Sequence, residues 1–126
     1  MLNNFDAQVY TKIISDAAKA LDVKVIIVSN NFNGKAIAPR LSVRLKAGLV
    51  SGAIALPDIS NGFTVKKSVF SGKAFANISI ATDIKIIGLN PNSYSITTTN
   101  ATADLAEFTT SVSAAKVQVT ATNKVI

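Results

Sequence analysis

The feature that most constrains the fold is an uninterrupted run of apolar, mostly β-branched residues, Val23–Ser29 (VKVIIVS), between two helical patterns. A strand with both faces covered reads as a continuous apolar run, whereas a half-exposed strand alternates apolar and polar residues. Layered parallel sheets with helices on both faces contain strands of this kind. The run therefore predicts a parallel sheet with this strand at its centre and with Ile26 and Ile27 buried.

Two helical patterns flank this run. Residues 4–21 carry apolar side chains at every fourth position, and Asn3 or Asn4 is placed to cap the helix. A second helix is predicted over about residues 35–47. Its start is placed there because Pro39 is tolerated only in the first turn of a helix. Helix, strand, loop and helix form part of a layered fold.

The second half of the chain changes to short extended segments. Strands are predicted at Ser51–Leu56, Phe63–Ser71, Ala74–Ile80 and Ile84–Leu89. The second and third of these are joined through a turn that contains Gly72, which is hairpin spacing. The expected fold class is therefore α/β, a layered parallel sheet with helices on both faces, extended by antiparallel strands in the second half.

The residues after these strands are polar. Residues 90–103 are rich in Thr, Ser and Asn and show no apolar periodicity, which predicts a linker. Beyond the linker, 105–112 and 116–122 have the composition of one further β arm. We therefore expect two parts, an α/β domain over 1–96 and a polar linker with a β arm over 97–126.

The absence of two residue types limits the possible chemistry. The chain contains no Cys and no His, which excludes thiol nucleophiles, Cys/His metal sites and His-dependent catalytic pairs. The seven carboxylates are scattered over predicted caps and turns, and no two form a convincing acid–base pair. The sequence therefore indicates a protein that is not an enzyme and that has no metal site.

The charge of the chain is basic but dispersed. The net charge is +6, yet the basic residues occur singly apart from Lys66–Lys67, so a solvated surface is expected rather than a nucleic-acid site. No apolar run approaches the ~20 residues that span a bilayer, and the first residues lack the order of a signal peptide. We expect a cytoplasmic protein with no membrane insertion and no nucleic-acid partner.

One loop has the position of a ligand site. The segment Ser29–Lys35 (SNNFNGK) joins the end of the buried strand to the second helix, and α/β sheets bind anions at such junctions. It contains one Gly and one Lys, Gly34 and Lys35, but lacks the P-loop pattern. We interpret it as a plain strand-to-helix connection, with a weak anion site at Gly34 and Lys35 as the alternative.

Four segments together match the pattern of one family. They are NGKAIAPRLSVRLKAGLVSG with its Gly-Lys and Pro-Arg steps, SVFSGKAFA in the paired strands, DIKIIGLNPNSYSI and VSAAKVQVT. Over Asn33–Ser95 the chain resembles the amino-terminal domain of the electron-transfer flavoprotein α subunit, and VSAAKVQVT resembles the arm that leads to that family's next domain. Lys73 stands where the family usually has Asn.

The resemblance implies an adenine-nucleotide-hydrolase-like fold and a role as a non-catalytic scaffold in an electron carrier. In that family an α and a β subunit share one FAD, which moves electrons from dehydrogenases to a quinone reductase. The FAD would be held by a domain absent from this chain, so no cofactor is expected here. A small nucleotide- or anion-binding α/β module is the alternative function.

The resemblance also implies that this chain is the later part of the family's amino-terminal domain. Without the strand–helix units that precede it in the family, one strand edge and part of an apolar face would be open. Open edges and exposed apolar faces drive pairing between chains. We therefore expect the chain to self-associate as a symmetric dimer, joined by strand edges or by exchange of the 105–122 arm.

Overall fold

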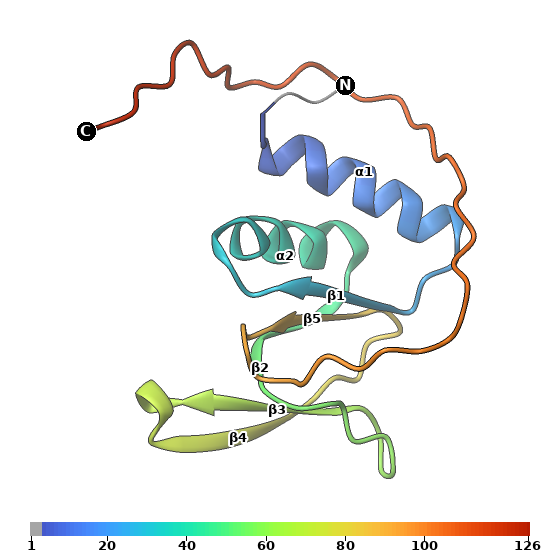
Figure 1. Cartoon of the computed structure of the whole chain (residues 1–126). Helices are drawn as coiled ribbons and strands as arrows, with labels where there is room; N and C mark the ends of the chain where they lie inside the picture. Colours follow the sequence, from blue (N-terminus) through green and yellow to red (C-terminus); the bar gives the residue numbers. More distant parts are fainter. Residues whose placement is uncertain (1–3) are drawn as a thin grey trace.

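The computed structural model describes residues 4–126, which form a mixed five-stranded sheet and two helices (Figure 1). The elements are α1 (Ala7–Ala20), β1 (Val25–Ser29), α2 (Phe32–Leu45), β2 (Gly48–Ala53), β3 (Thr64–Val69), the short 3-10 turn η1 (Phe70–Gly72), β4 (Ala74–Ser79) and β5 (Lys85–Leu89). The strand order is β1-β5-β2-β3-β4. The first three strands are parallel, and β3 and β4 are antiparallel. The predicted α/β class, with a parallel sheet extended by antiparallel strands, is confirmed.

The first helix begins later than the sequence predicted. Asp6 accepts a hydrogen bond from the backbone N–H of Val9 at 2.8 Å and is the cap of α1. Of the two asparagines predicted to cap this helix, Asn4 lies before its start and Asn3 lies outside the described residues. The capping carboxylate also suits the positive end of the helix dipole.

The second helix begins earlier than the sequence predicted. Asn31 accepts a hydrogen bond from the N–H of Gly34 at 2.9 Å and caps α2. Pro39 therefore lies inside the helix, where it has no N–H to donate to the carbonyl of Lys35. The predicted start near residue 35 was wrong, because an asparagine cap and a buried helix face outweigh the cost of one interior proline.

The second strand is also displaced from its predicted place. β2 begins at Gly48, directly after Lys46 ends α2 in a left-handed conformation with φ 52°. The strand pairs in parallel with β5 from Gly48 opposite Lys85 onward. The prediction placed it at 51–56, and it was wrong because pairing with β5 selects the residues that extend.

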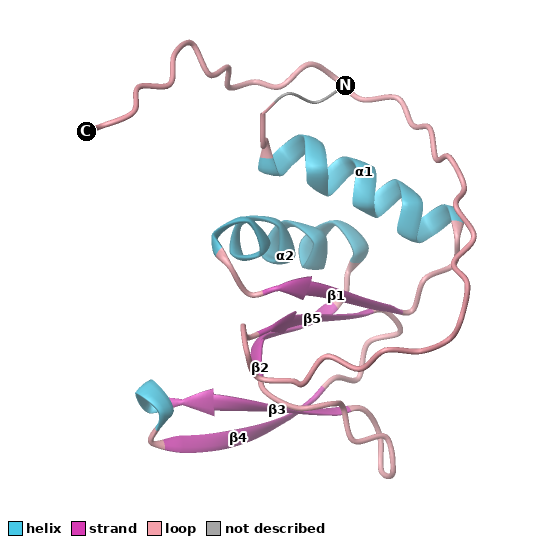
Figure 2. Cartoon of the chain, viewed as in Figure 1, coloured by secondary structure: helices cyan, strands magenta, loops and turns pink. Residues whose placement is uncertain are grey.

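The strand β1 lies at the edge of the sheet and not at its centre. Ile26 and Val28 pack against the cluster around α2, whereas Ile27 is 63% exposed on the opposite face. α2 packs on the parallel strands and α1 packs on α2, so both helices lie on one side of these strands (Figure 2). The predictions of a central strand, of helices on both faces and of a buried Ile27 were therefore wrong.

The hairpin and the last strand agree with the sequence prediction. β3 and β4 pair antiparallel from Thr64 opposite Ser79 to Val69 opposite Ala74. Gly72 adopts a φ of 87° in the turn between them, which is a conformation that favours glycine. β5 forms within the predicted segment 84–89, between β1 and β2. The central strand of the parallel sheet is therefore β5.

The core has two parts that meet at β5. Leu41 of α2 and Ile86 of β5 are fully buried in the cluster under the helices. Val65 of β3 and Ile87 of β5 belong to the second cluster, on the hairpin side. Because successive residues of a strand point to opposite faces, β5 contributes to both clusters and holds the two halves of the chain together.

Residues 90–126 contain neither helix nor strand (Figure 2). The strands predicted at 105–112 and 116–122 are not formed, because an alternating pattern needs a neighbouring strand to pair with. Figure 1 shows this segment, in orange to red, passing along one side of the body and past α1, then running away from it. We call residues 97–126 the arm. The division between 96 and 97 into two parts stays a prediction.

Leu41→Ala should lower the free energy of unfolding by about 2–5 kcal/mol, because the Leu41 side chain is 0% exposed. Val43→Ala is the matched control on the same helix, where Val43 is 82% exposed, and it should cost no more than about 0.5 kcal/mol. Urea unfolding followed by circular dichroism measures both. Equal losses for the two variants would contradict the assignment of the buried face of α2.

Candidate functional site

Polar side chains meet where the parallel strands end. Asn30 follows β1, Asn90 follows β5 and Ser51 lies in β2. The side-chain amide of Asn30 donates to Asn90 Oδ1 at 2.7 Å, and Ser51 Oγ donates to Asn30 Oδ1 at 2.8 Å. We call these three residues the strand-end cluster. It lies at the carboxyl edge of the parallel strands, where sheets of this class bind ligands.

Small residues allow the strand ends to approach one another. A Cβ atom at Gly88 would lie 3.2 Å from Asn30 Oδ1 and 3.4 Å from Ser51 Cα, so a larger side chain would push the cluster apart. The backbone adds further bonds, since the N–H of Asn30 donates to Leu89 O at 2.8 Å. The cluster therefore holds the three strands in register at this edge.

A groove of about 440 Å³ opens beside the cluster. It is lined by the ends of β1 and β5, by Asn31 and by the loop Asn90–Tyr94. Its polar atoms come from amides, hydroxyls and backbone, and none of its lining residues is charged. Such a groove can donate and accept hydrogen bonds, but no carboxylate, ammonium or guanidinium group lines it.

The structure places Gly34 and Lys35 in the first turn of α2 and outside the lining of this groove. A Cβ atom at Gly34 would lie 1.7 Å from Ser29 O, so glycine is required for the helix to pack against the end of β1. The N–H of Gly34 donates to Asn31 Oδ1, and the N–H of Lys35 donates to Asn31 O, each at 2.9 Å. The Gly34 N–H, which an anion could use, therefore already has a partner, and the Lys35 N–H makes the first regular bond of the helix. Anion binding at these residues stays a prediction.

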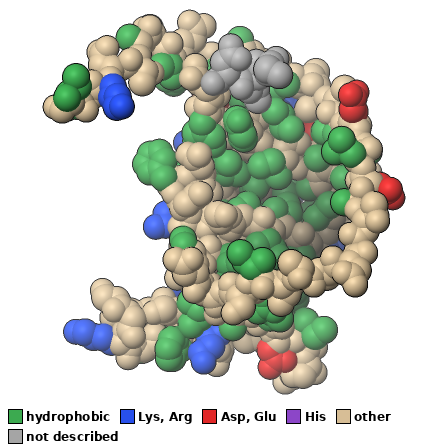
Figure 3. Space-filling view, in the orientation of Figure 1, with side chains coloured by type: hydrophobic (Ala, Val, Ile, Leu, Met, Phe, Trp, Pro, Cys, Tyr) green, Lys and Arg blue, Asp and Glu red, His purple; other side chains and the backbone are tan. Residues whose placement is uncertain are grey.

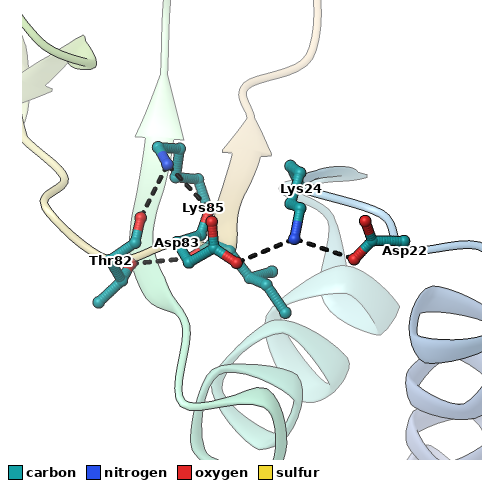
Figure 4. Close-up of polar contacts among 6 residues, drawn as sticks. Asp22, Lys24, Thr82, Asp83 and Lys85 are labelled. Carbon is teal, nitrogen blue, oxygen red and sulfur yellow. Dashed lines mark hydrogen bonds and ion pairs between the residues drawn. The ribbon is translucent and has the colours of Figure 1, made fainter.

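A charged cluster lies at the opposite ends of the same strands. Lys24 binds the carboxylates of Asp22 at 2.9 Å and Asp83 at 3.0 Å, and Lys85 donates to the carbonyl oxygens of Thr82 and Asp83 (Figure 4). The hydrogen bond that Lys24 donates to Asp22, followed by the one that it donates to Asp83, raises the pKa of Lys24. These groups are exposed, so their ion pairs contribute little to stability. The cluster joins the turn before β1 to the turn before β5.

Sequence reasoning did not find this meeting of Asp22 and Asp83. The two residues are far apart in the sequence, and only the parallel pairing of β1 with β5 brings them to the same ammonium group. No local sequence signal reports such a contact, because it depends on which strands become neighbours.

A third polar contact binds the arm to α1. Asp16, in the middle of α1, forms an ion pair with Lys12 and accepts a hydrogen bond from Thr110 Oγ1 at 2.6 Å. The hydrogen bond from Lys12, followed by that from Thr110, lowers the pKa of Asp16. A recess of about 230 Å³ lies beside this contact, between α1 and the arm residues 112–116. The sequence placed Asp16 at a cap or turn, so this contact was missed.

The recess between the two helices has a different character. It measures about 680 Å³ and is lined by Gln8, Thr11, Pro39, Arg40, Val43 and Arg44. Both arginines of the chain are among these residues, yet no acid–base or nucleophilic pair accompanies them. Across residues 4–126 no group of three or more potential metal ligands occurs. The helices of the same residues include none that is long and apolar enough to cross a membrane.

The fold and the site define a layered α/β domain with a hairpin extension, in which the parallel strands end in an uncharged polar cluster. The family model described as the electron transfer flavoprotein domain matches residues 1–122, which is nearly the whole chain. The chain therefore belongs to the electron transfer flavoprotein domain family, and the resemblance found in the sequence is confirmed.

Three relatives carry related names. The electron transfer flavoprotein subunit alpha of Thermoanaerobacterium thermosaccharolyticum is 33% identical over 79 residues, which is 62% of this chain and 24% of that protein. The subunit alpha of Bacillus subtilis is 28% identical over 92 residues, 72% of this chain and 28% of that protein. The putative electron transfer flavoprotein subunit YdiR of Escherichia coli is 32% identical over 82 residues, which is 65% of this chain and 26% of that protein. The matches thus span about a quarter of each relative's length.

Asn30→Ala should lower the free energy of unfolding by about 1–3 kcal/mol, because it removes the amide shared by Ser51 and Asn90. Asn33→Ala is the matched control, since Asn33 is exposed in the first turn of α2. Urea unfolding of both variants measures the difference. A loss for Asn33→Ala as large as that for Asn30→Ala would contradict the role of the strand-end cluster.

Thr110→Val should raise the pKa of Asp16 toward its ordinary value of 3.8, because one hydrogen bond to the carboxylate is lost. Carboxyl chemical shifts recorded by NMR against pH measure this pKa, with Ser111→Ala as the control. The folded-state pKa lies below the unfolded value, so the contact stabilises the protein above the unfolded pKa and this contribution is lost as the pH falls through the folded-state pKa. An unchanged pKa in Thr110→Val would show that the arm leaves α1 in solution.

Proposed function

We propose that this chain is a non-catalytic scaffold part of an electron-transfer flavoprotein α subunit. The observation that carries this proposal is the family match over residues 1–122, together with relatives named as alpha subunits. The structure supports a scaffold role, because its polar clusters at Asn30, Lys24 and Asp16 all join one element of the chain to another. The complete protein would carry electrons rather than catalyse a reaction of its own.

The FAD of such a protein would be bound outside this chain. A flavin dinucleotide carries two phosphates, which proteins bind with free N–H groups at helix N-termini or with basic side chains. The groove at the strand ends is lined by no basic residue, and the N–H groups of Gly34 and Lys35 already donate to Asn31. This groove therefore lacks the basic side chains that bind the phosphates of a flavin dinucleotide, which supports a site outside this chain.

The proposed partner is the β subunit of the same electron-transfer flavoprotein. Dehydrogenases and a quinone reductase would exchange electrons with the assembled complex rather than with this chain. The interface would use the sheet and helices as a rigid platform, since these elements hold the buried core. The cytoplasmic location and the absence of a nucleic-acid partner stay predictions.

A small nucleotide- or anion-binding module is a second candidate function. The position of the groove favours it, because the groove lies at the carboxyl ends of parallel strands, beside the start of α2. Isothermal titration with AMP tests this function. Micromolar binding that Lys35→Ala abolishes would support it, and no heat in either protein would leave the scaffold function as the better proposal.

The scaffold proposal predicts two results for the purified chain. It should bind the β subunit from its own organism in a calorimetric titration, because the family's subunits work as pairs. After incubation with excess FAD and gel filtration, it should show no bound flavin absorbance in the visible range, because its groove does not fit the dinucleotide. A stoichiometric yellow complex with the chain alone, or no binding to the β subunit, would contradict the proposal.

A further inference from the structure

One edge of the sheet has free backbone groups. Among residues 4–126, β1 pairs with β5 alone. The carbonyl of Lys24 accepts from the N–H of Lys85, and the N–H of Asn30 donates to Leu89 O. Because inward and outward groups alternate along a strand, residues 24, 26, 28 and 30 face β5. Val25, Ile27 and Ser29 then direct their N–H and C=O groups away from the sheet.

The surface around this edge is apolar. Val25 is 40% and Ile27 is 63% exposed, and no residue of β1 carries a charge. Tyr10 and Ile14 of α1 are only partly buried, because α1 packs on α2 and not on a strand. Figure 3 shows hydrophobic side chains gathered on the face that α1, α2 and β1 present to the viewer, with the arm along one side. Open edges with such surroundings pair with other strands.

The arm carries a segment that has the pattern of a strand but pairs with no strand in the part of the chain that the structure describes. Val117 and Val119 are 75% and 53% exposed, and they alternate with Gln118 and Thr120. Residues 117–123 contain no charge. An alternating, uncharged segment of this kind suits the edge of β1, which is also uncharged.

The path of the arm favours binding to the β1 edge of a second copy rather than to the β1 edge of the same chain. The contact between Thr110 and Asp16 holds the arm against α1, and residues 112–116 follow the same helix. Beyond that point Figure 1 shows the chain leaving the body.

We propose that the free edge of β1 binds residues 117–121 from the arm of a second copy of this chain, as an added antiparallel strand with Val119 opposite Ile27. The outward backbone groups of β1 would then gain partners, and the two valines of the arm would cover the exposed side of the strand. A reciprocal exchange gives a two-fold dimer with two added strands.

The proposed register also matches the charges at the end of the strand. With Val119 opposite Ile27, Ala121 lies opposite Val25 and Lys124 reaches the position opposite Asp22. The Asp22 side chain is 84% exposed, so it can accept a second cation. No like charges face one another across the added pair, so this register carries no penalty from charge repulsion.

Engineered cysteines test the pairing without competing disulfides from native cysteines, because the chain contains no Cys. Ile27→Cys and Val119→Cys proteins are unfolded, refolded together and mildly oxidised, and the disulfides are identified by mass spectrometry. The expected product joins position 27 of one chain to position 119 of another. Gln118→Cys in place of Val119→Cys is the control, and it should cross-link at most about one tenth as much, because its side chain points to the other face. Cross-links between two copies of Ile27→Cys alone, or equal yields at 118 and 119, would overturn the proposal.

Sedimentation equilibrium tests the dimer itself. The wild-type chain should sediment at twice its 13.2 kDa monomer mass at micromolar concentration, and Val119→Lys should weaken the dimer by at least about tenfold. Val125→Lys is the matched control, because Val125 is 92% exposed and lies outside the pairing segment. A monomeric wild-type protein, or equal effects of the two variants, would overturn the proposal. Its failure would leave the calorimetric result with the β subunit unaffected, so the two proposals fail separately.

Discussion

The insertion of β5 between β1 and β2 is the interaction on which the rest of the structure depends. β5 is the last strand in the chain, yet it becomes the centre of the parallel sheet. Ile86 packs under the helices and Ile87 packs toward the hairpin, so one strand unites both core clusters. The same insertion aligns Asn30 with Asn90 at one edge and Lys24 with Asp83 at the other. Forming it requires closure of a long loop, whose entropy cost is repaid only when both clusters are buried.

The polar groups at the strand ends bind one another rather than remain free. The strand-end cluster satisfies its own hydrogen bonds among amide and hydroxyl groups, and every described buried side-chain polar atom has a partner. A site built for acid–base catalysis holds at least one group with a pKa shifted for the task. Here the groups with a shifted pKa are Lys24, Asp16 and Asp58. Lys24 and Asp16 join elements of the chain together, and Asp58 accepts hydrogen bonds from Ser60 within its own turn.

Local sequence patterns predicted the helices and strands better than they predicted which strands lie side by side. The hairpin around Gly72 was predicted because its signals, two extended segments and a glycine turn, lie within one short stretch of sequence. The start of α2 was not predicted correctly. The preference of proline for the first turn of a helix placed the start near residue 35, whereas the cap at Asn31 places it at Phe32. Gly34 and Lys35 were predicted to lie in the loop before this helix, and they lie in its first turn; their role as an anion site stays a prediction. The strand-end cluster was missed, because Asn30 and Asn90 become neighbours only through the sheet.

The sequence by itself determined the α/β class, the hairpin and the family, because helical periodicity, turn residues and motif order are local properties that survive without a folded context. Only the tertiary structure decided that β1 is an edge strand. The run VIIVS has the same sequence whether both faces of its strand are covered or only one is. Its exposure depends on which strands and helices pack beside it. The position of Ile27 at an open edge and the contact of Thr110 with Asp16 follow from strand order and chain path. These are properties of packing, which no short segment of the sequence contains.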